Sequence, residues 1–139
     1  MKNTVYVVIL SVFLAISGIT GFSTVVKAGN TSDTSYSFYN ANVDDYTNGR
    51  AKLDTTKVYI YPNSGPALYY TVQGGSNGSW SNRSNRHVVN NGVQASFTNF
   101  VYENNEHSAR LHLERLSTAY DTTYGVWSPD SSRNYTIFN

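Results

Sequence analysis

The stretch ARLHLE at residues 109–114 decides the fold class, because its side chains alternate strictly between apolar and polar. Ala109, Leu111 and Leu113 are apolar, and each residue that follows one of them is polar or charged. A period of two is typical of an antiparallel strand with one face on the core and the other in solvent. The sequence therefore predicts a β-strand here, with its aliphatic side chains pointing inward.

Similar short segments occur on both sides of this strand, separated by clusters of Asn, Gly, Ser and Pro. The expected strands cover residues 35–40, 57–61, 68–72, 88–89, 93–98, 109–114, 123–127 and 135–138. No stretch carries the apolar stripe of an amphipathic helix. Seven or eight short strands at a spacing near ten residues predict an all-β domain, either an antiparallel β-sandwich or a small barrel.

The connections between these segments lead to specific predictions. PNSGP at residues 62–66 is expected to join strands 57–61 and 68–72 into a hairpin. Asn91-Gly92 suits a type I′ turn and predicts a second hairpin between residues 88–89 and 93–97.

Three other segments are expected to lie outside strands. They are a loop at 42–49, a polar loop of thirteen residues from Gly74 to Arg86, and a turn at Ser128-Pro129-Asp130-Ser131.

The N-terminal residues predict an export signal. Lys2 precedes an apolar run from Val5 to Phe22, and Val26-Lys27-Ala28 has the small-x-small pattern that signal peptidases cut. A retained membrane anchor is the alternative, since eighteen apolar residues can just span a bilayer. We expect residues 1–28 to be a signal peptide cleaved after Ala28, so that the chain is secreted and meets the membrane only through an uncleaved signal peptide.

Cleavage there leaves 111 residues, enough for one domain. We expect 29–35 to be a flexible leader and 36–139 to be the single β-sandwich domain. The processed chain has eight Lys or Arg against nine Asp or Glu, which argues against nucleic acid and anionic lipid as partners. Cysteine is absent, so no disulfide staples the domain, which favours a bacterial protein over a eukaryotic secretory scaffold.

Aliphatic residues are scarce in the processed chain. Leu, Ile, Val and Phe account for 19 of its residues, whereas it contains eleven Tyr and two Trp. The aromatic side chains therefore supply much of the apolar area, and Trp127, next to Gly125 and Val126, is expected in the core.

No catalytic residue is predicted. Ser76 lies in GGSNG at 74–78, which matches G-x-S-x-G, but no helix follows it as a nucleophile elbow requires. The acidic residues fall as neighbours in surface turns and not as an acid and base pair across a cleft. We expect the protein not to be an enzyme and to need no cofactor.

Two groups of residues are candidates for metal binding. The histidines His87, His107 and His112 lack the tight spacing of metal ligands, so no metal site is predicted from them. A loop rich in oxygen ligands differs from an EF-hand in spacing, and its side chains are more typical of turn formation; calcium binding stays open. Its residues are Asn40, Asn42, Asp44, Asp45 and Asn48.

Exposed aromatic residues are the strongest candidates for ligand binding. Tyr59 and Tyr61 alternate with Val58 and Ile60, Tyr69 and Tyr70 lie on the next strand, and Trp80 is isolated in the polar loop. Flat rings beside Asn and Arg donors suit a sugar chain or a peptide surface, whereas Tyr also serves as core filler in sandwiches short of aliphatic residues. We predict a binding surface, with a cell-wall glycan or an envelope protein as partner. Its expected residues are Trp80, Tyr59, Tyr61 and Tyr69.

RLHLER at 110–115 and YGVWSPD at 124–130 resemble the end of small exported proteins of Gram-positive bacteria. KVYIY at 57–61 and LYYTV at 68–72 resemble the same group, which is a domain-of-unknown-function family and so defines no catalytic residue. The composition is also loosely similar to that of bacteriocins of the lactococcin 972 type. These resemblances imply either a non-enzymatic binding module at the cell envelope or, as the alternative, a secreted antimicrobial or bacteriocin-associated protein.

Overall fold

Two β-sheets form the domain in the computed structural model, which describes residues 29–76 and 78–139. The first, here the β10 sheet, has the strand order β1 (Thr34–Tyr39), β10 (Thr122–Ser131), β4 (Lys57–Ser64), β8 (Ala95–Phe97) and β11 (Thr136–Phe138). The second, the β9 sheet, has the order β2 (Asp44–Tyr46), β9 (Ser108–Arg115), β5 (Leu68–Ser76) and β6 (Ser79–Asn82). In addition, β3 (Arg50–Ala51) pairs with β9, and β7 (His87–Val89) pairs with β5.

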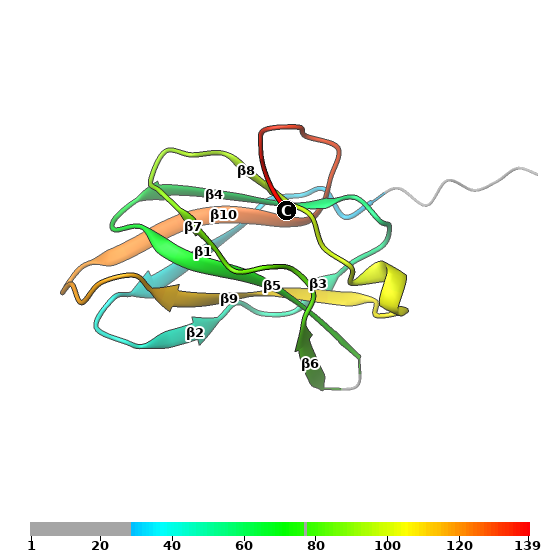
Figure 1. Ribbon diagram of the computed structural model, residues 1–139, viewed down its shortest axis with the longest axis horizontal. Coiled ribbons are helices and arrows are strands. Elements are labelled where there is room, and N and C mark those ends of the chain that lie inside the picture. Colours follow the sequence, from blue (N-terminus) through cyan, green and yellow to red (C-terminus); the bar gives the residue numbers. More distant parts are fainter. Residues whose placement is uncertain (1–28, 77) are drawn as a thin grey trace, which may run out of the picture.

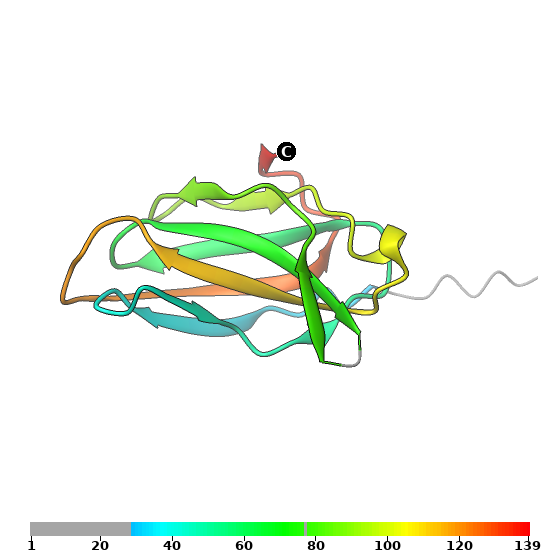
Figure 2. The same ribbon diagram turned by 60° about the horizontal axis from the view of Figure 1, so that its bottom comes forward.

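The two sheets lie against each other as the layers of a curled sandwich, which confirms the predicted all-β class (Figures 1 and 2). The inward residues of β9 are the predicted ones, since Ala109, Leu111 and Leu113 are all buried. Trp127 of β10 is 1% exposed in the same core, also as predicted. Among the described residues the only helical element is the short 3₁₀ turn η1 (Tyr102–Asn104), and no helix there is long and apolar enough to cross a membrane.

The predicted hairpin around residues 62–66 is wrong, because β4 and β5 belong to different sheets. β4 pairs with β10 and β8, whereas β5 pairs with β9, β6 and β7. The chain crosses from one layer to the other through this segment, where Gly65 has a φ of 86°. Two prolines and a glycine mark a change of direction, but they do not determine whether the next strand returns to the same sheet.

The predicted hairpin at Asn91-Gly92 is wrong for a related reason. Val93 N–H donates to the carbonyl of Asn90, which closes a four-residue turn, but only Gly92 of the two central residues has a positive φ. A type I′ turn needs a positive φ at both central positions. A positive φ at the second central position alone is typical of a type II turn, which lets the flanking strands diverge. Accordingly β7 joins the β9 sheet and β8 joins the β10 sheet.

Three segments predicted as loops or turns are wholly or partly strand. Residues 74–76 extend β5, and 79–82 form β6, which projects from the end of β5 as a hairpin (Figure 1). The expected loop at 42–49 contains β2, and β10 continues to Ser131 across a register shift after Ser128 that accommodates Pro129. β11 is a strand as predicted, but it runs parallel to β8, so the fold is not purely antiparallel. Short polar strands lack the apolar alternation by which strands are recognised in a sequence.

The N-terminal segment is joined to the body of the domain. β1 begins at Thr34, within the expected leader, and forms an edge of the β10 sheet. Further toward the N-terminus, Asn30 N–H donates to a carboxylate oxygen of Asp130 at 2.7 Å.

Candidate functional site

The outer face of the β9 sheet collects the side chains that alternate with its core residues. In register, Tyr46 of β2 faces His112 of β9, Arg110 faces Gln73 of β5, and Gly75 faces Trp80 of β6. Residues directly opposite in neighbouring strands share a face of the sheet. This pairing therefore places planar side chains from β2, β9 and β6 on one surface of the sheet.

Four of these side chains form a continuous row, defined here as the planar row: Trp80, Arg110, Tyr46 and His112. The guanidinium carbon of Arg110 lies 4.5 Å from the ring centroid of Trp80 and 4.1 Å from that of Tyr46. Tyr46 stacks on His112 with 4.6 Å between centroids and 12° between planes. Such cation–π contacts hold the side chains in place by about 0.5–1 kcal/mol each at exposed sites.

Arg110 is fixed by a hydrogen bond as well as by stacking. Its Nε donates to Oε1 of Gln73 at 2.8 Å, and Gln73 Nε2 donates to Oδ1 of Asn82 at 2.9 Å. Partial burial lowers the pKa of Arg110 below its usual value, but a guanidinium remains charged at neutral pH. The row thus carries one positive charge held at a defined position.

The backbone that contacts the Trp80 ring belongs to two glycines, which have no side chains. A Cβ atom on Gly49 would lie 2.6 Å from Cη2 of the indole, and one on Gly75 would lie 2.6 Å from its Cε3. The indole therefore rests against two glycines and is only half-buried. Trp80 is a β6 residue, and not a residue of a polar loop as the sequence had predicted.

Tyr69 lies on the same outer face, next to a group of charged residues. The guanidinium carbon of Arg86 is 4.4 Å from the Tyr69 ring centroid, and Arg86 Nη1 is 3.1 Å from Oε1 of Glu114. His112 links this group to the planar row, with its Nε2 3.1 Å from Oδ2 of Asp44 and its Nδ1 3.8 Å from Oε2 of Glu114. The structure thus brings Trp80 and Tyr69, two of the four expected binding residues, onto one surface.

Tyr59 and Tyr61 lie elsewhere, because β4 belongs to the β10 sheet. Tyr59 is 4% exposed; its hydroxyl donates to Oε1 of Gln94 at 2.9 Å, and the Arg133 guanidinium carbon lies 4.4 Å from its ring centroid. Burial raises the pKa of Tyr59, against the opposing effect of Arg133. Tyr61 is half-buried and pairs with Val126. The four predicted residues therefore do not form one surface.

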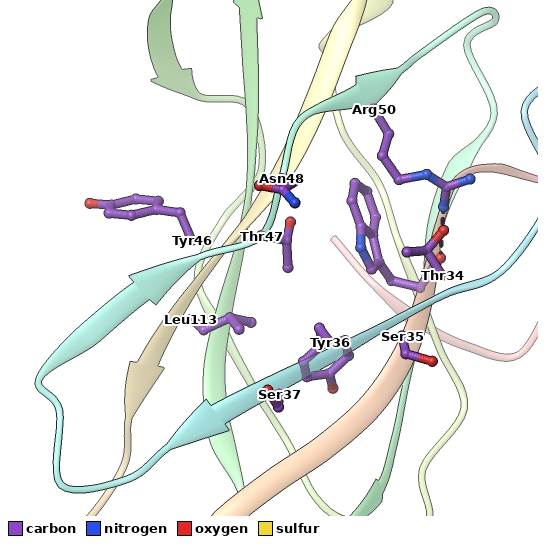
Figure 3. Close-up of a pocket in the computed structure, with 10 residues that line it drawn as sticks. Thr34, Ser35, Tyr36, Ser37, Tyr46, Thr47, Asn48, Arg50 and Leu113 are labelled. Atoms are coloured by element: carbon purple, nitrogen blue, oxygen red, sulfur yellow. Dashed lines mark hydrogen bonds between the residues drawn. The ribbon is translucent and has the colours of Figure 1, made fainter.

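A cleft of about 350 Å³ opens where β1 meets the segment from β2 to β3 (Figure 3). Tyr36, Leu113 and Trp127 provide its apolar lining, and the guanidinium carbon of Arg50 lies 5.4 Å from the Trp127 ring centroid. Tyr46 also lines it, although its ring points away from the other labelled residues (Figure 3). The hydroxyl and amide groups around it come from Thr34, Ser35, Ser37, Thr47 and Asn48.

A second groove, of about 480 Å³, lies at the opposite seam of the sandwich. Phe100, which is 57% exposed, is its aromatic residue. The rest of the lining is polar: Asn82, Arg83, Ser84, Asn85, Thr98, Asn104 and Asn139.

The sequence alone predicted neither the cleft nor the second groove, and it did not place Tyr46 and Arg110 in a binding surface. The outward parity of Arg110 and His112 was evident from ARLHLE. Their aromatic partners come from strands that are remote in sequence, and no local pattern indicates that pairing.

The residues weighed as calcium ligands diverge in the structure. The Asn40 side chain is buried and donates to Oγ1 of Thr123 at 3.0 Å, Asp44 contacts His112, and Asp45 accepts from the N–H of Tyr46. Across residues 29–76 and 78–139, no three His, Cys, Asp or Glu side chains are grouped closely enough to hold a metal ion.

The fold and this surface define the class of protein. It is a curled two-sheet β-sandwich whose outer face carries stacked aromatic and cationic side chains. Residues 24–131 match the family model described as "Protein of unknown function (DUF2712)", and the chain belongs to this family. This match confirms the resemblance to a domain-of-unknown-function family. No curated protein and no solved structure gives a significant match to the chain.

Proposed function

We propose that this chain is an exported, non-enzymatic binding module of the bacterial cell envelope, and that its ligand contacts the outer face of the β9 sheet. Export is supported by the sequence of residues 1–28, which has the charge, apolar run and cleavage pattern of a signal peptide. Those residues lie outside the part of the chain that the structure describes. Cleavage after Ala28 releases the processed domain outside the membrane.

The planar row is the observation that carries the binding proposal. Arg110, Tyr46 and His112 already hold one another through stacking, and hydrogen bonds to Gln73 and Asp44 fix Arg110 and His112, so their ordering costs little further entropy when a ligand binds. Tyr46 is 42% exposed and Trp80 is half-buried, which leaves ring area and one fixed cation at the surface. Aromatic and Arg side chains are the residue types that most often dominate binding surfaces.

A wall glycan fits these features better than a phosphate polymer does. The outer face alternates Arg86 and Arg110 with Asp44 and Glu114, so it has no uniform positive charge to attract polyanions. Flat rings next to amide and guanidinium donors offer both an apolar contact and hydrogen bonds to a neutral sugar chain. The exposed side-chain amide of Asn82, held by a hydrogen bond from the buried Gln73, continues the donor set from Arg110 toward the second groove.

Co-sedimentation of residues 29–139 with purified peptidoglycan tests this proposal. Trp80→Ala should raise the dissociation constant at least tenfold if the indole is a binding anchor, since such anchors contribute about 2 kcal/mol or more. Tyr120→Ala is the matched control, because Tyr120 is 87% exposed and belongs to neither sheet. Equal binding by a folded Trp80→Ala variant would refute the proposed surface.

Two further measurements test the rest of the proposal. Mass spectrometry of the protein recovered from culture medium should show Gly29 as its first residue, whereas a retained leader would make the domain a tethered one. Growth inhibition of neighbouring strains by the purified domain, without wall binding, would favour the antimicrobial alternative.

A further inference from the structure

Gly29, the residue that follows the predicted cleavage site, is packed against two carboxyl groups. A Cβ atom placed on it would lie 2.5 Å from Oδ2 of Asp54 and 2.9 Å from Cβ of Asp130. The Cα atom is one carbon–carbon bond, about 1.5 Å, from that Cβ position, so it lies within about 4 Å of the Asp54 oxygen. The backbone nitrogen of Gly29 is bonded directly to this Cα atom. Only glycine allows the backbone to approach the carboxylates this closely.

The neighbouring residues hold Gly29 at this place. Asn30 N–H donates to Oδ2 of Asp130 at 2.7 Å, and the N–H of Asp130 donates back to the Asn30 carbonyl at 3.3 Å. The Asn30 side chain donates to the carbonyl of Ala51 at 3.0 Å and accepts from Arg50 at 3.1 Å. The position of Gly29 is therefore set by its contacts with the β10 sheet and β3.

Not every carboxylate oxygen around Gly29 has a cationic partner within hydrogen-bond distance. Asp54 and Asp130 carry two negative charges, and Lys52 supplies one positive charge, its Nζ 2.7 Å from Asp130 and 3.8 Å from Oδ1 of Asp54. The charge of Arg50 also acts on Asp130, but its guanidinium donates hydrogen bonds to the Trp127 carbonyl, Asn30 and Ser32 and to no carboxylate.

One carboxylate oxygen at this site has no donor among the described residues. Oδ1 of Asp54 accepts from the N–H and the hydroxyl of Thr56. Oδ2 of Asp54, the oxygen that faces Gly29, receives no hydrogen bond from residues 29–76 or 78–139. The site thus has room for one more cationic donor, on the side of Gly29.

We propose that Asp54 is the receptor for the α-ammonium group that processing creates at Gly29. Signal peptidase adds water across the Ala28–Gly29 peptide bond, so that Ala28 leaves as a carboxylate and Gly29 gains an amine. The amine takes a proton at neutral pH, because an α-amino group has a pKa of about 7.7–8.0. The resulting cation pairs with Oδ2 of Asp54, and the domain gains this stabilisation only once the leader has been removed.

This inference rests on the export part of the proposed function and concerns a different site from the planar row. The amide nitrogen of an unprocessed chain carries no charge, so it cannot neutralise Asp54. Pairing with a carboxylate raises the pKa of the amine, so its contribution to stability is present below about pH 8 and is lost as the pH rises through the raised pKa.

Melting temperatures of two versions of residues 29–139 test the pairing. All the strands and the buried core that the structure describes lie within these residues. One version has a free amine on Gly29, released from a fusion by a protease that leaves no extra residue, and the other is acetylated there, which removes the charge. At pH 6.5 the free-amine version should melt about 2–6 °C higher, and the difference should vanish above about pH 9.

Asp54→Asn should abolish the difference between the two versions, since asparagine keeps the Oδ1 acceptor for Thr56 but removes the negative charge. Asp121→Asn is the matched control, because Asp121 is exposed on the connection before β10, and it should leave the difference unchanged. Equal melting of the free and acetylated chains, or a difference that persists in Asp54→Asn, would overturn the proposal.

A second measurement keeps the proposal testable if Asp54→Asn folds poorly. NMR titration of the Gly29 α-amine in the unsubstituted protein should give a pKa above the ordinary 7.7–8.0, and a value at or below this range would refute the ion pair. Failure of wall binding would leave these results untouched. A mature N-terminus other than Gly29 would overturn the physiological role of the pair without changing the melting comparison.

Discussion

Tyr36 and Tyr70 join the two sheets through one hydrogen bond, with 2.8 Å between their hydroxyl oxygens. Both phenols are buried, so each hydroxyl depends on the other. Tyr70→Phe should cost about 1–3 kcal/mol of unfolding free energy, because it leaves the Tyr36 hydroxyl without its partner. In urea denaturation the Tyr36→Phe/Tyr70→Phe double variant should lose less than the sum of the single losses. Strictly additive losses would show that the hydroxyls do not depend on each other.

The same pair predicts a response to alkaline pH. Burial raises the pKa of both Tyr36 and Tyr70, with the neighbouring Tyr70 adding to the effect at Tyr36. Because the folded state keeps these phenols neutral, their contribution to stability is full below the unfolded pKa of about 10 and declines as the pH rises above it. Denaturation between pH 8 and 11.5 should show a steeper loss for the unsubstituted protein than for the double Phe variant. Parallel curves would contradict the assignment.

A substitution at Gly49 tests how closely the Trp80 ring packs against the backbone. The three atoms nearest to a Cβ atom there would all belong to the Trp80 ring, so Gly49→Ala should displace the indole and cost about 1–3 kcal/mol. In a Trp80→Ala background the same change should cost little, which a double-mutant cycle of unfolding free energies would measure. If the cost of Gly49→Ala is the same in both backgrounds, the indole does not occupy this place.

Lys52 and Asp130 tie the connection between β3 and β4 to strand β10. Both side chains are fully buried, and Lys52 Nζ also donates to the carbonyl of Thr56 at 2.5 Å. Lys52→Met should cost about 3–5 kcal/mol, because it leaves a buried carboxylate unpaired. Arg86→Met, which removes the exposed pair with Glu114, is the control and should cost no more than about 1 kcal/mol. Similar losses for the two variants in urea denaturation would contradict this contrast.

Asp130 also sets the response of this junction to acid. Burial alone would raise its pKa, but hydrogen bonds from Lys52, Asn30 and Leu53 outweigh that effect and hold the pKa below its ordinary value. Its contribution is therefore present above the unfolded pKa of about 3.9 and is lost as the pH falls below it. Unfolding measured from pH 6 to pH 2 should show this loss, and Lys52→Met should reduce it.

The elements show how far the sequence could predict the fold. Alternation of apolar residues located β9, β4, β5 and the core half of β10, because burial of one face is a local pattern. It could not assign strands to sheets, since β4 and β5 are consecutive in sequence and yet lie in opposite layers. It also missed β6, whose polar residues are held by backbone pairing to β5 and not by burial.

The candidate site shows the same division between local and non-local information. Trp80 was recognisable as an aromatic residue in polar surroundings, and the outward parity of Arg110 followed from ARLHLE. The planar row itself depends on register between β2, β9, β5 and β6. Tyr59 was expected to be exposed but is buried, because alternation gives the face of a strand but not what covers that face, which here includes Arg133 and Tyr135.

The molecule as a whole is joined by pairs of strands that are far apart in the sequence. β1 pairs with β10, and β2 pairs with β9, so these two edge strands join their sheets only after most of the chain has been placed. Folding dominated by such non-local pairing is slow, in the range of milliseconds to seconds. Stopped-flow refolding of residues 29–139 should fall in that range, and complete refolding in microseconds would contradict the observed topology.

The two tryptophans occupy different layers, and this gives the protein a pair of built-in optical reporters. Trp127 is enclosed between the sheets, whereas Trp80 rests on glycine backbone beside Arg110 at the outer face. Emission from Trp127 should follow the integrity of the core, and emission from Trp80 should follow events at the surface. Spectra of Trp80→Phe and Trp127→Phe variants would separate the two signals, so ligand contact could be followed without attaching a dye.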